Sequence, residues 1–152
     1  QCMYLSRSMK SLFNIGILYK SMCLYNEMMK PLAKKYDCSS TMIDMLLFLG
    51  NNPEYKFAKD IVEVRGIKAN LVSMNLEKLV ERGFVRVFAS RKDRRQKEIE
   101  VTSKAEPILQ EGRLIQKQYF NWLLEGIDPE EKKVFLNVLK QIADHFDQGD
   151  ER

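Results

Sequence analysis

The chain of 152 residues has little of what catalytic and metal centres require. It contains a single histidine, His145, and three cysteines, Cys2, Cys23 and Cys38, with no CxxC spacing. That odd number and spacing argue against a disulfide framework and against a structural zinc site. The nucleophile, dinucleotide, phosphate-loop and zinc-protease motifs do not occur either. We therefore expect no enzyme, no metal and no cofactor, and we expect His145 to be a partly exposed helix residue.

Long apolar stretches are also missing. No apolar run reaches the roughly 18 residues that a membrane-spanning helix needs, and no secretory signal is visible after Gln1. We therefore expect a cytoplasmic protein without a membrane segment. A hydrophobic content of 45% with 30% charged residues is ordinary for one globular domain of this length.

Positive charge is present in excess, and its distribution is uneven. The net charge is +4, but residues 56–100 hold 12 Lys and Arg against 7 Asp and Glu, whereas the remainder holds 13 against 14. A localised basic patch is typical of proteins that bind polyanions. Charge alone leaves a merely solvated basic face equally open.

Apolar residues at helical spacing predict a mostly α-helical chain. Helices are expected at about 7–36, 41–50, 57–64, 68–82, 103–124 and from 128 onward. Two short alternating runs, 84–89 and 97–101, predict a hairpin of two strands. Pro31 should bend or break the first helix, and Thr41 with Asp44 resembles a capping box for the second. The predicted fold class is mostly α with a small β-wing.

The two short helices joined by Arg65-Gly66-Ile67 have the outline of a helix-turn-helix. If Val72, Leu76 and Leu79 face the core, the amino end of the second helix is free to enter the major groove of DNA. Lysine pairs with phosphate, asparagine forms two hydrogen bonds with adenine, and serine can reach a phosphate or a base. An ordinary amphipathic helix is the alternative. The candidate DNA-binding residues here are Lys68, Ala69, Asn70, Ser73 and Met74.

The loop between the two predicted strands, residues 90–96, carries four positive charges and one negative charge. Arginine suits a narrow minor groove, which concentrates negative potential, so this wing provides further DNA-binding candidates. Asp93 cannot attract phosphate. We expect its carboxylate to orient the guanidinium group of Arg95 by a charge-assisted hydrogen bond, or alternatively to favour the turn. The wing candidates are Arg91, Lys92, Arg94 and Arg95.

The stretch "DRRQKEIEVTSKA", after "GIKANLVSMNLEKLVERGFV", resembles the MarR family of winged helix-turn-helix transcriptional regulators. Asp93-Arg94-Arg95 matches the D-x-R pattern of their wing, and Thr102 matches the threonine that opens the next helix. The resemblance spans about residues 10–147. It implies a single domain over 1–152, with a winged helix-turn-helix DNA-binding lobe at about 40–101 and long terminal dimerisation helices at about 7–37 and 103–147.

The same resemblance implies a function. The chain would be a homodimeric, sequence-specific regulator of transcription, with a repressor's role, that binds a pseudo-palindromic operator in double-stranded DNA. Leu71 and Met74 depart from the family, which often has threonine and a basic residue there. The alternative is a winged-helix module that binds a protein partner without specific affinity for DNA.

A small aromatic or lipophilic effector is a further implication of the family. Met is adaptable and suits a permissive site, although plain core packing is the competing interpretation for each candidate. Thiol sensing through Cys23 also stays open. The candidate effector-pocket residues are Phe13, Tyr19, Met22, Met45 and Phe48.

Overall fold

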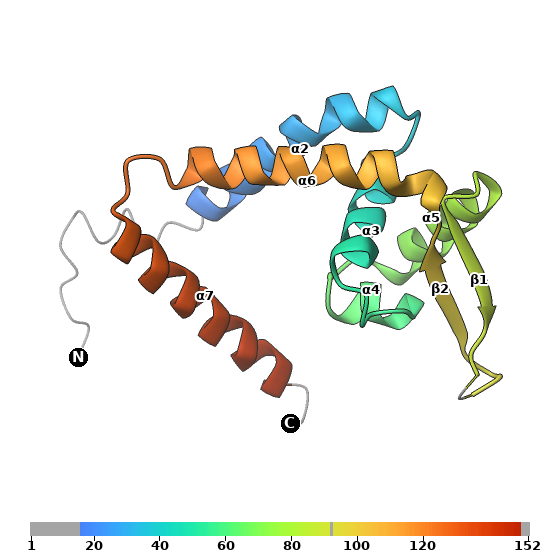
Figure 1. Cartoon of the computed structure of the whole chain (residues 1–152). Coiled ribbons are helices and arrows are strands. Elements are labelled where there is room, and N and C mark those ends of the chain that lie inside the picture. The colour runs from blue at the N-terminus through green and yellow to red at the C-terminus, as the bar shows by residue number, and fades with distance from the viewer. Residues whose placement is uncertain (1–15, 92, 150–152) are drawn as a thin grey trace. The chain divides into compact units, whose positions relative to one another are not determined.

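The computed structural model describes residues 16–91 and 93–149, and of residues 146–149 it describes only the backbone. The expected mostly helical fold with a two-stranded wing is confirmed (Figure 1). The described chain forms two compact units, one ending at Gln116 and one beginning at Lys117, so that the boundary lies inside α6. The elements are α2 (Gly16–Lys35), α3 (Ser40–Asn51), α4 (Ala58–Glu63), α5 (Ala69–Glu81), β1 (Val85–Ala89), β2 (Lys97–Val101), the short 3-10 helix η1 (Ser103–Ala105), α6 (Glu106–Leu123) and α7 (Pro129–Gly149).

Helix α3 is at the centre of the first unit. It is apolar on nearly every side, as the sequence predicts, and seven of its 12 residues are buried. Side chains from the helices and the hairpin around it complete one core, and each fully buried apolar side chain of this size contributes about 1.5 to 3 kcal/mol. The largest fully buried members are Ile43, Met45, Leu46, Leu47, Ile61, Val72, Leu79, Val85 and Ile108.

Two glycines allow α3 and the first half of α6 to pack closely. A Cβ atom on Gly112 would lie 2.6 Å from the side chain of Leu47, and one on Gly50 would lie 2.7 Å from that of Leu109. Both leucines are buried and have little room to shift. Arg113 of α6 adds a hydrogen bond of 2.9 Å to the carbonyl oxygen of Gly50. The start of α6 is thus held against the end of α3.

The start of α3 differs from the prediction. Ser39 is the N-cap, because its hydroxyl accepts a hydrogen bond of 3.0 Å from the backbone N–H of Met42. The predicted capping box at Thr41 was wrong because several residues here can cap a helix, and the first of them takes that place. Asp44, its expected second member, instead forms an ion pair of 2.9 Å with Arg65.

Helix α2 runs through Pro31 without a break. The predicted start at about residue 7 lies outside the described residues. The helix ends at a left-handed residue, Asp37, whose φ is 51°. The N–H of Asp37 bonds to the carbonyl of Lys34 at 3.2 Å, and that of Cys38 bonds to the carbonyl of Ala33 at 2.8 Å. This pair of bonds is the Schellman motif, which satisfies two of the carbonyl groups that a helix end leaves open.

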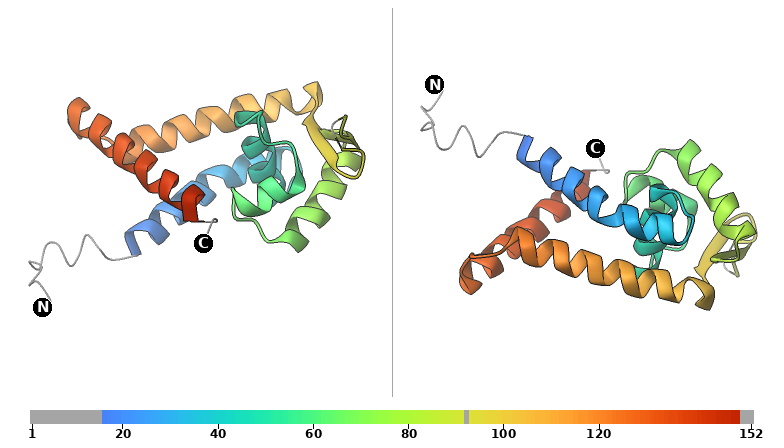
Figure 2. Two further views of the ribbon diagram at one scale, coloured as in Figure 1. Left: turned by 90° about the horizontal axis from the view of Figure 1, so that it is seen from below. Right: turned by 90° about the horizontal axis from the view of Figure 1, so that it is seen from above.

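The hairpin is antiparallel, with Val85 opposite Val101 and Ala89 opposite Lys97. Thr102 closes its base, because its hydroxyl donates to the carbonyl oxygen of Gly83 at 2.6 Å. The helix that follows begins at Glu106 after η1, rather than at the predicted Ser103. Strand β1 contacts α5, and the hairpin and α5 stay adjacent when the molecule is turned (Figure 2).

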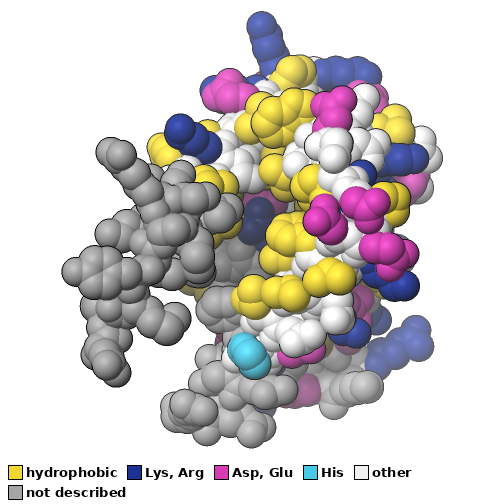
Figure 3. Space-filling view, turned by 90° about the vertical axis from the view of Figure 1, so that its left-hand side faces the viewer, with side chains coloured by type: hydrophobic (Ala, Val, Ile, Leu, Met, Phe, Trp, Pro, Cys, Tyr) yellow, Lys and Arg dark blue, Asp and Glu magenta, His cyan; other side chains and the backbone are white. Residues whose placement is uncertain are grey.

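The second unit consists of the remainder of α6 and α7. Asp128 caps α7 as predicted, because its carboxylate accepts the N–H of Glu130 at 2.8 Å. No described side chain of α7 is buried. Hydrophobic side chains and the single histidine are visible at the surface in Figure 3. None of the described helices is long and apolar enough to cross a membrane. The exposed large apolar residues of α7 are Val134, Phe135, Leu136, Val138, Leu139 and Ile142.

Candidate nucleic-acid interface

The amino-terminal half of α5 exposes the side chains that the sequence predicts for base contacts. Val72 and Leu79 are buried, so the opposite side of the helix is directed to solvent. Val80, next to Leu79 in the chain, is 42% exposed. The role of each candidate in DNA binding stays a prediction. The exposed candidates are Lys68, Ala69, Asn70, Ser73 and Met74.

A buried polar contact fixes α5 against α3, and the sequence did not reveal it. Asn75 is 3% exposed. Its amide oxygen accepts a hydrogen bond of 2.7 Å from the hydroxyl of Ser39, and its amide nitrogen donates to the carbonyl of Leu71 at 2.8 Å. The Ser39 hydroxyl therefore caps α3 and binds α5 at once. Because buried polar groups need partners, this pair selects one arrangement of the two helices.

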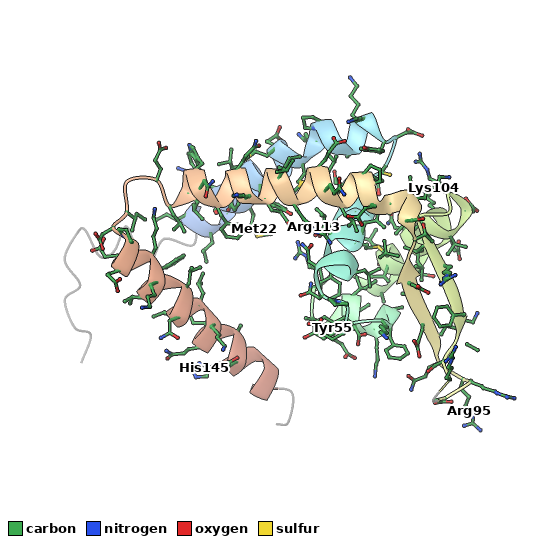
Figure 4. The ribbon with its side chains drawn as sticks, viewed as in Figure 1. Met22, Tyr55, Arg95, Lys104, Arg113 and His145 are labelled. Carbon is green, nitrogen blue, oxygen red and sulfur yellow. The ribbon has the colours of Figure 1, made fainter. Side chains whose placement is uncertain are left out.

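The wing tip presents arginine side chains to solvent. Arg91, Arg94 and Arg95 are exposed, and Arg95 lies at the end of the hairpin (Figure 4). Within the described part of the chain, none of the three takes part in an ion pair. Lys92 lies outside the described residues. Three uncompensated cations at one turn are what a phosphate or a narrow minor groove attracts.

Asp93 acts on the backbone of the wing tip. Its carboxylate accepts a hydrogen bond of 2.9 Å from the backbone N–H of Arg95. No described ion pair joins it to the Arg95 guanidinium group, so the structure has the turn that we gave as the alternative. The reason is local, because an aspartate two residues before an N–H reaches that N–H in a tight turn. That Asp93 orders the wing stays a prediction. The contact that would do so is its hydrogen bond to the main chain of Arg95.

The sides of the wing are close to neutral, unlike its tip. Arg86 on β1 and Glu100 on β2 are directly opposite each other, and their side chains form an ion pair of 2.7 Å. The hydrogen bond from Arg86 holds the pKa of the Glu100 carboxyl below its ordinary value. Farther along, the Ser90 hydroxyl donates to the Glu98 carboxylate at 2.6 Å. Free positive charge on the hairpin is therefore concentrated at the turn.

The predicted effector-pocket residues do not come together within the described chain. Met45 and Phe48 are buried in the core, whereas Tyr19 and Met22 are 70% and 59% exposed on α2. Met22 is labelled in Figure 4. Phe13 lies outside the described residues. Helical spacing placed all of them on apolar faces, but it does not tell a core position from a surface that awaits a partner.

The structure also has hollows that could not be predicted from the sequence, because they form where separate elements meet. One of about 300 Å³ lies between α2 and α3 and includes Tyr25 and Met29. A smaller one of about 170 Å³ is lined by Phe48, Arg65 and Gln116. Another, of about 580 Å³, lies between the wing, the loop after α3 and the start of α6.

The cysteines show no grouping that would form a metal centre. Among the described residues, no cluster of three or more His, Cys, Asp or Glu side chains has the arrangement of a metal site. A hydrogen bond with Cys23 raises the pKa of the Tyr19 hydroxyl, and burial raises the pKa of the Cys38 thiol. Whether Cys23 senses oxidants stays an open prediction.

Comparison with known proteins agrees with this geometry. Residues 39–96 match the sequence model of the MarR family. A MarR regulator of Oenococcus oeni is 22% identical, with a TM-score of 0.67 over 86% of this chain and 99% of the other. One from Methanosarcina mazei Go1 is 20% identical, with a TM-score of 0.69 over 90% and 94%. BpsR of Bordetella bronchiseptica is 16% identical, with a TM-score of 0.65 over 85% and 91%. No significant match is found among curated proteins.

The exposed helix-turn-helix and its arginine wing are the elements of a winged helix-turn-helix fold, which this chain shares with solved MarR regulators. The matched segment covers the helix-turn-helix and most of the hairpin, which are the elements that carry the resemblance seen in the sequence. This segment, residues 39–96, is similar to the MarR family of transcriptional regulators.

Proposed function

We propose that this regulator is a homodimeric repressor that binds a pseudo-palindromic operator and leaves it when a small molecule binds. The observation that carries the proposal is the pairing of two features in one lobe. Helix α5, whose amino end is exposed, contacts strand β1 of a hairpin whose tip holds three exposed arginines that no described ion pair engages. A helix of this kind reads bases in the major groove, while the wing contacts the phosphates or the neighbouring minor groove.

The exposed apolar side chains of α7 support the dimer. Phe135, Val138, Leu139 and Ile142 recur at helical spacing and are 41% to 46% exposed. A contiguous apolar stripe of this kind marks a protein interface. A second copy of the chain is the partner that gives two lobes related by twofold symmetry. Their α5 helices would then read half-sites about 34 to 36 Å apart, which is one turn of DNA.

Release by an effector is supported by the hollows beside α2 and α3 and by one relative. The description of BpsR from Bordetella bronchiseptica states that its DNA binding is regulated by 6-hydroxynicotinic acid, a small aromatic compound. For the present chain we infer an aromatic or lipophilic effector that favours a dimer whose α5 helices no longer match the groove spacing. Such a ligand acts only by its difference in affinity for the two states.

A binding titration tests the proposal. A preferred duplex is first selected by the protein from a pool of random 30-base-pair sequences, and a scrambled version serves as the control. Fluorescence anisotropy is then measured at about 50 and 200 mM salt. A protein that contacts several phosphates loses affinity by orders of magnitude over this range. The preferred duplex should bind more tightly than its scrambled version at both concentrations.

Asn70→Ala locates the base contact. We expect a loss of about 1 to 3 kcal/mol that is confined to one base pair of each half-site. The matched control is Asn26→Ala, at an exposed asparagine of α2, which should leave DNA binding unchanged. An equal loss from Asn70→Ala on every duplex would assign Asn70 to phosphate.

Two other outcomes would change the proposal. Weak binding without salt dependence, and without a preferred duplex, would favour the winged-helix module that binds a protein partner. A panel of small aromatic acids and lipophilic compounds that neither releases the duplex nor raises the melting temperature would refute the effector step and leave DNA binding intact.

A further inference from the structure

The carboxyl end of α5 is held by one arginine that bridges two helix ends. Arg82 is the C-cap residue of α5. One guanidinium nitrogen, Nη2, donates to the carbonyl oxygen of Tyr36 at 2.8 Å. The other, Nη1, donates to the carbonyl oxygen of Asp37. Both acceptors follow directly after the last residue of α2, so Arg82 joins the end of the recognition helix to the end of α2.

The acceptors are the groups that the α2 terminus leaves open. The Schellman bonds to the carbonyls of Ala33 and Lys34 satisfy part of that terminus. The carbonyls of Tyr36 and Asp37 lie beyond those bonds and point to the guanidinium group of Arg82. A helix carboxyl end also carries partial negative charge, which favours a cation there. The planar fork of arginine suits two neighbouring acceptors, whereas the ammonium group of lysine has no such fork.

Further contacts join Arg82 to η1, and Tyr36 to α6. Lys104, in η1, donates to the carbonyl oxygen of Arg82 at 2.7 Å. The Arg82 guanidinium and the Lys104 ammonium lie 5.3 and 5.5 Å from the ring centre of the buried Phe84. Glu111 of α6 accepts a hydrogen bond of 2.7 Å from the hydroxyl of Tyr36. The ends of α2 and α5 and the start of α6 therefore meet around one side chain.

We propose that Arg82 is a positioning residue for DNA recognition, which sets the angle at which the exposed amino end of α5 meets the groove. The inference rests on the proposed function. Arg82 acts from the far end of the helix, through the main chain of Tyr36 and Asp37. The Asp37 carboxylate itself is fully exposed and 3.6 Å from the guanidinium group, so the two carbonyl contacts carry the effect.

The test compares Arg82→Lys with Arg82→Gln on the selected duplex and on its scrambled version. Arg82→Lys keeps the charge and loses the fork. We expect it to bind the selected duplex about 10-fold or more weakly, the scale of one lost base contact. Affinity for the scrambled duplex and the salt dependence should not change. Hydrogen exchange of the amides at residues 36–38 and in the last turn of α5 should become faster.

The matched control is Arg86→Lys, an arginine-to-lysine change on β1 whose partner is a side-chain carboxylate. It should leave the preference for the selected duplex unchanged. If Arg82→Lys binds like the wild type while Arg82→Gln weakens both duplexes and lowers the salt slope by about one, Arg82 contacts phosphate and the proposal is wrong. Unchanged binding by both variants would overturn it as well.

Two provisions keep the test decisive. Should Arg82→Lys fail to fold by circular dichroism, Lys104→Gln removes the hydrogen bond to the Arg82 carbonyl and the cation beside Phe84 while leaving Arg82 in place. It should reduce affinity for the selected duplex more than for the scrambled one, and unchanged selectivity then refutes the proposal. If the wild-type protein selects no duplex, the proposed function fails, and hydrogen exchange at residues 36–38 still decides whether Arg82 joins the two helix ends.

Discussion

The two units of this protein differ in how far their apolar side chains are buried. In the first unit, apolar residues gather in one core around α3, and buried polar atoms such as those of Asn75 have partners. In the second, α7 has an apolar stripe of comparable length, but no described side chain on it is buried. A helix in isolation gains little stability from its own hydrogen bonds. The comparison teaches that the first unit covers its apolar side chains in a core of its own, whereas the apolar side chains of α7 are left exposed among the described residues.

The largest expected effect comes from a charge placed in the exposed apolar stripe of α7. We expect Ile142→Asp to weaken dimerisation by about 30-fold or more, because a charge at the centre of an apolar interface costs at least as much as a lost hot spot. Sedimentation equilibrium measures the effect, and DNA binding should fall with it. Asn137→Asp adds the same charge on the opposite side of α7 and is the control. A dimer that survives Ile142→Asp would place the interface elsewhere.

The first unit should instead lose stability when a buried polar contact is removed. Asn75→Ala leaves the Ser39 hydroxyl without its acceptor and opens space at the crossing of α3 and α5. The expected cost is about 1 to 3 kcal/mol in the free energy of unfolding, measured by urea denaturation. Dimerisation should be unaffected if the two units are stabilised separately. Asn26→Ala, at an exposed position, is the matched control and should cost far less.

Variants at the wing tip distinguish the effect of its charge from the effect of its backbone hydrogen bond. Arg95→Ala should weaken DNA binding and lower the salt slope by about one, as for the loss of one phosphate contact. Asp93→Ala should also weaken binding, although it removes a negative charge, because the N–H of Arg95 loses its acceptor. Asp93→Asn keeps an acceptor oxygen and removes the charge, so it should bind at least as tightly as the wild type. Anisotropy with the selected duplex measures all three variants, and tighter binding by Asp93→Ala would leave only charge as the cause.

The smallest expected effect concerns pH. Hydrogen bonds from Lys35 and then Tyr36 lower the pKa of the Glu111 carboxyl. Its contribution to stability is therefore fully present above the ordinary glutamate range of about 4.3 and is lost as the pH falls through the lower pKa of the folded state. The urea midpoint of the wild type should exceed that of Glu111→Gln at neutral pH and converge with it in acid. Glu54→Gln, at an exposed loop carboxylate, is the matched control for the removal of a carboxylate.

The sequence predicted most of the fold because its signals are local. The periodicity of α3 and α5, the alternation of β1 and β2 and the Asp128 cap of α7 each depend on a few neighbouring residues. The misses have two causes. Ser39 rather than Thr41 caps α3, because several neighbouring residues here can cap a helix. Asp44 pairs with Arg65, a partner farther along the chain that is known only once the helices are placed.

The candidate interface was predictable to the same degree. Exposure of Asn70, Ser73 and the wing arginines follows from the periodicity of α5 and from the charge of the loop. The contacts that orient them do not, because Asn75 and Arg82 bind groups 36 to 46 residues away in sequence. The effector pocket stays a prediction, since an apolar residue such as Met22 has the same spacing whether it faces a core or a partner.

The glycines at the crossing of α3 and α6 have a mechanical consequence. Because the side chains of Leu47 and Leu109 lie directly against Gly112 and Gly50, even a methyl group at either glycine would overlap a buried leucine. We therefore expect α3 and the first half of α6 to move together. Under the proposed function, the bending that releases an operator would then occur elsewhere in the protein.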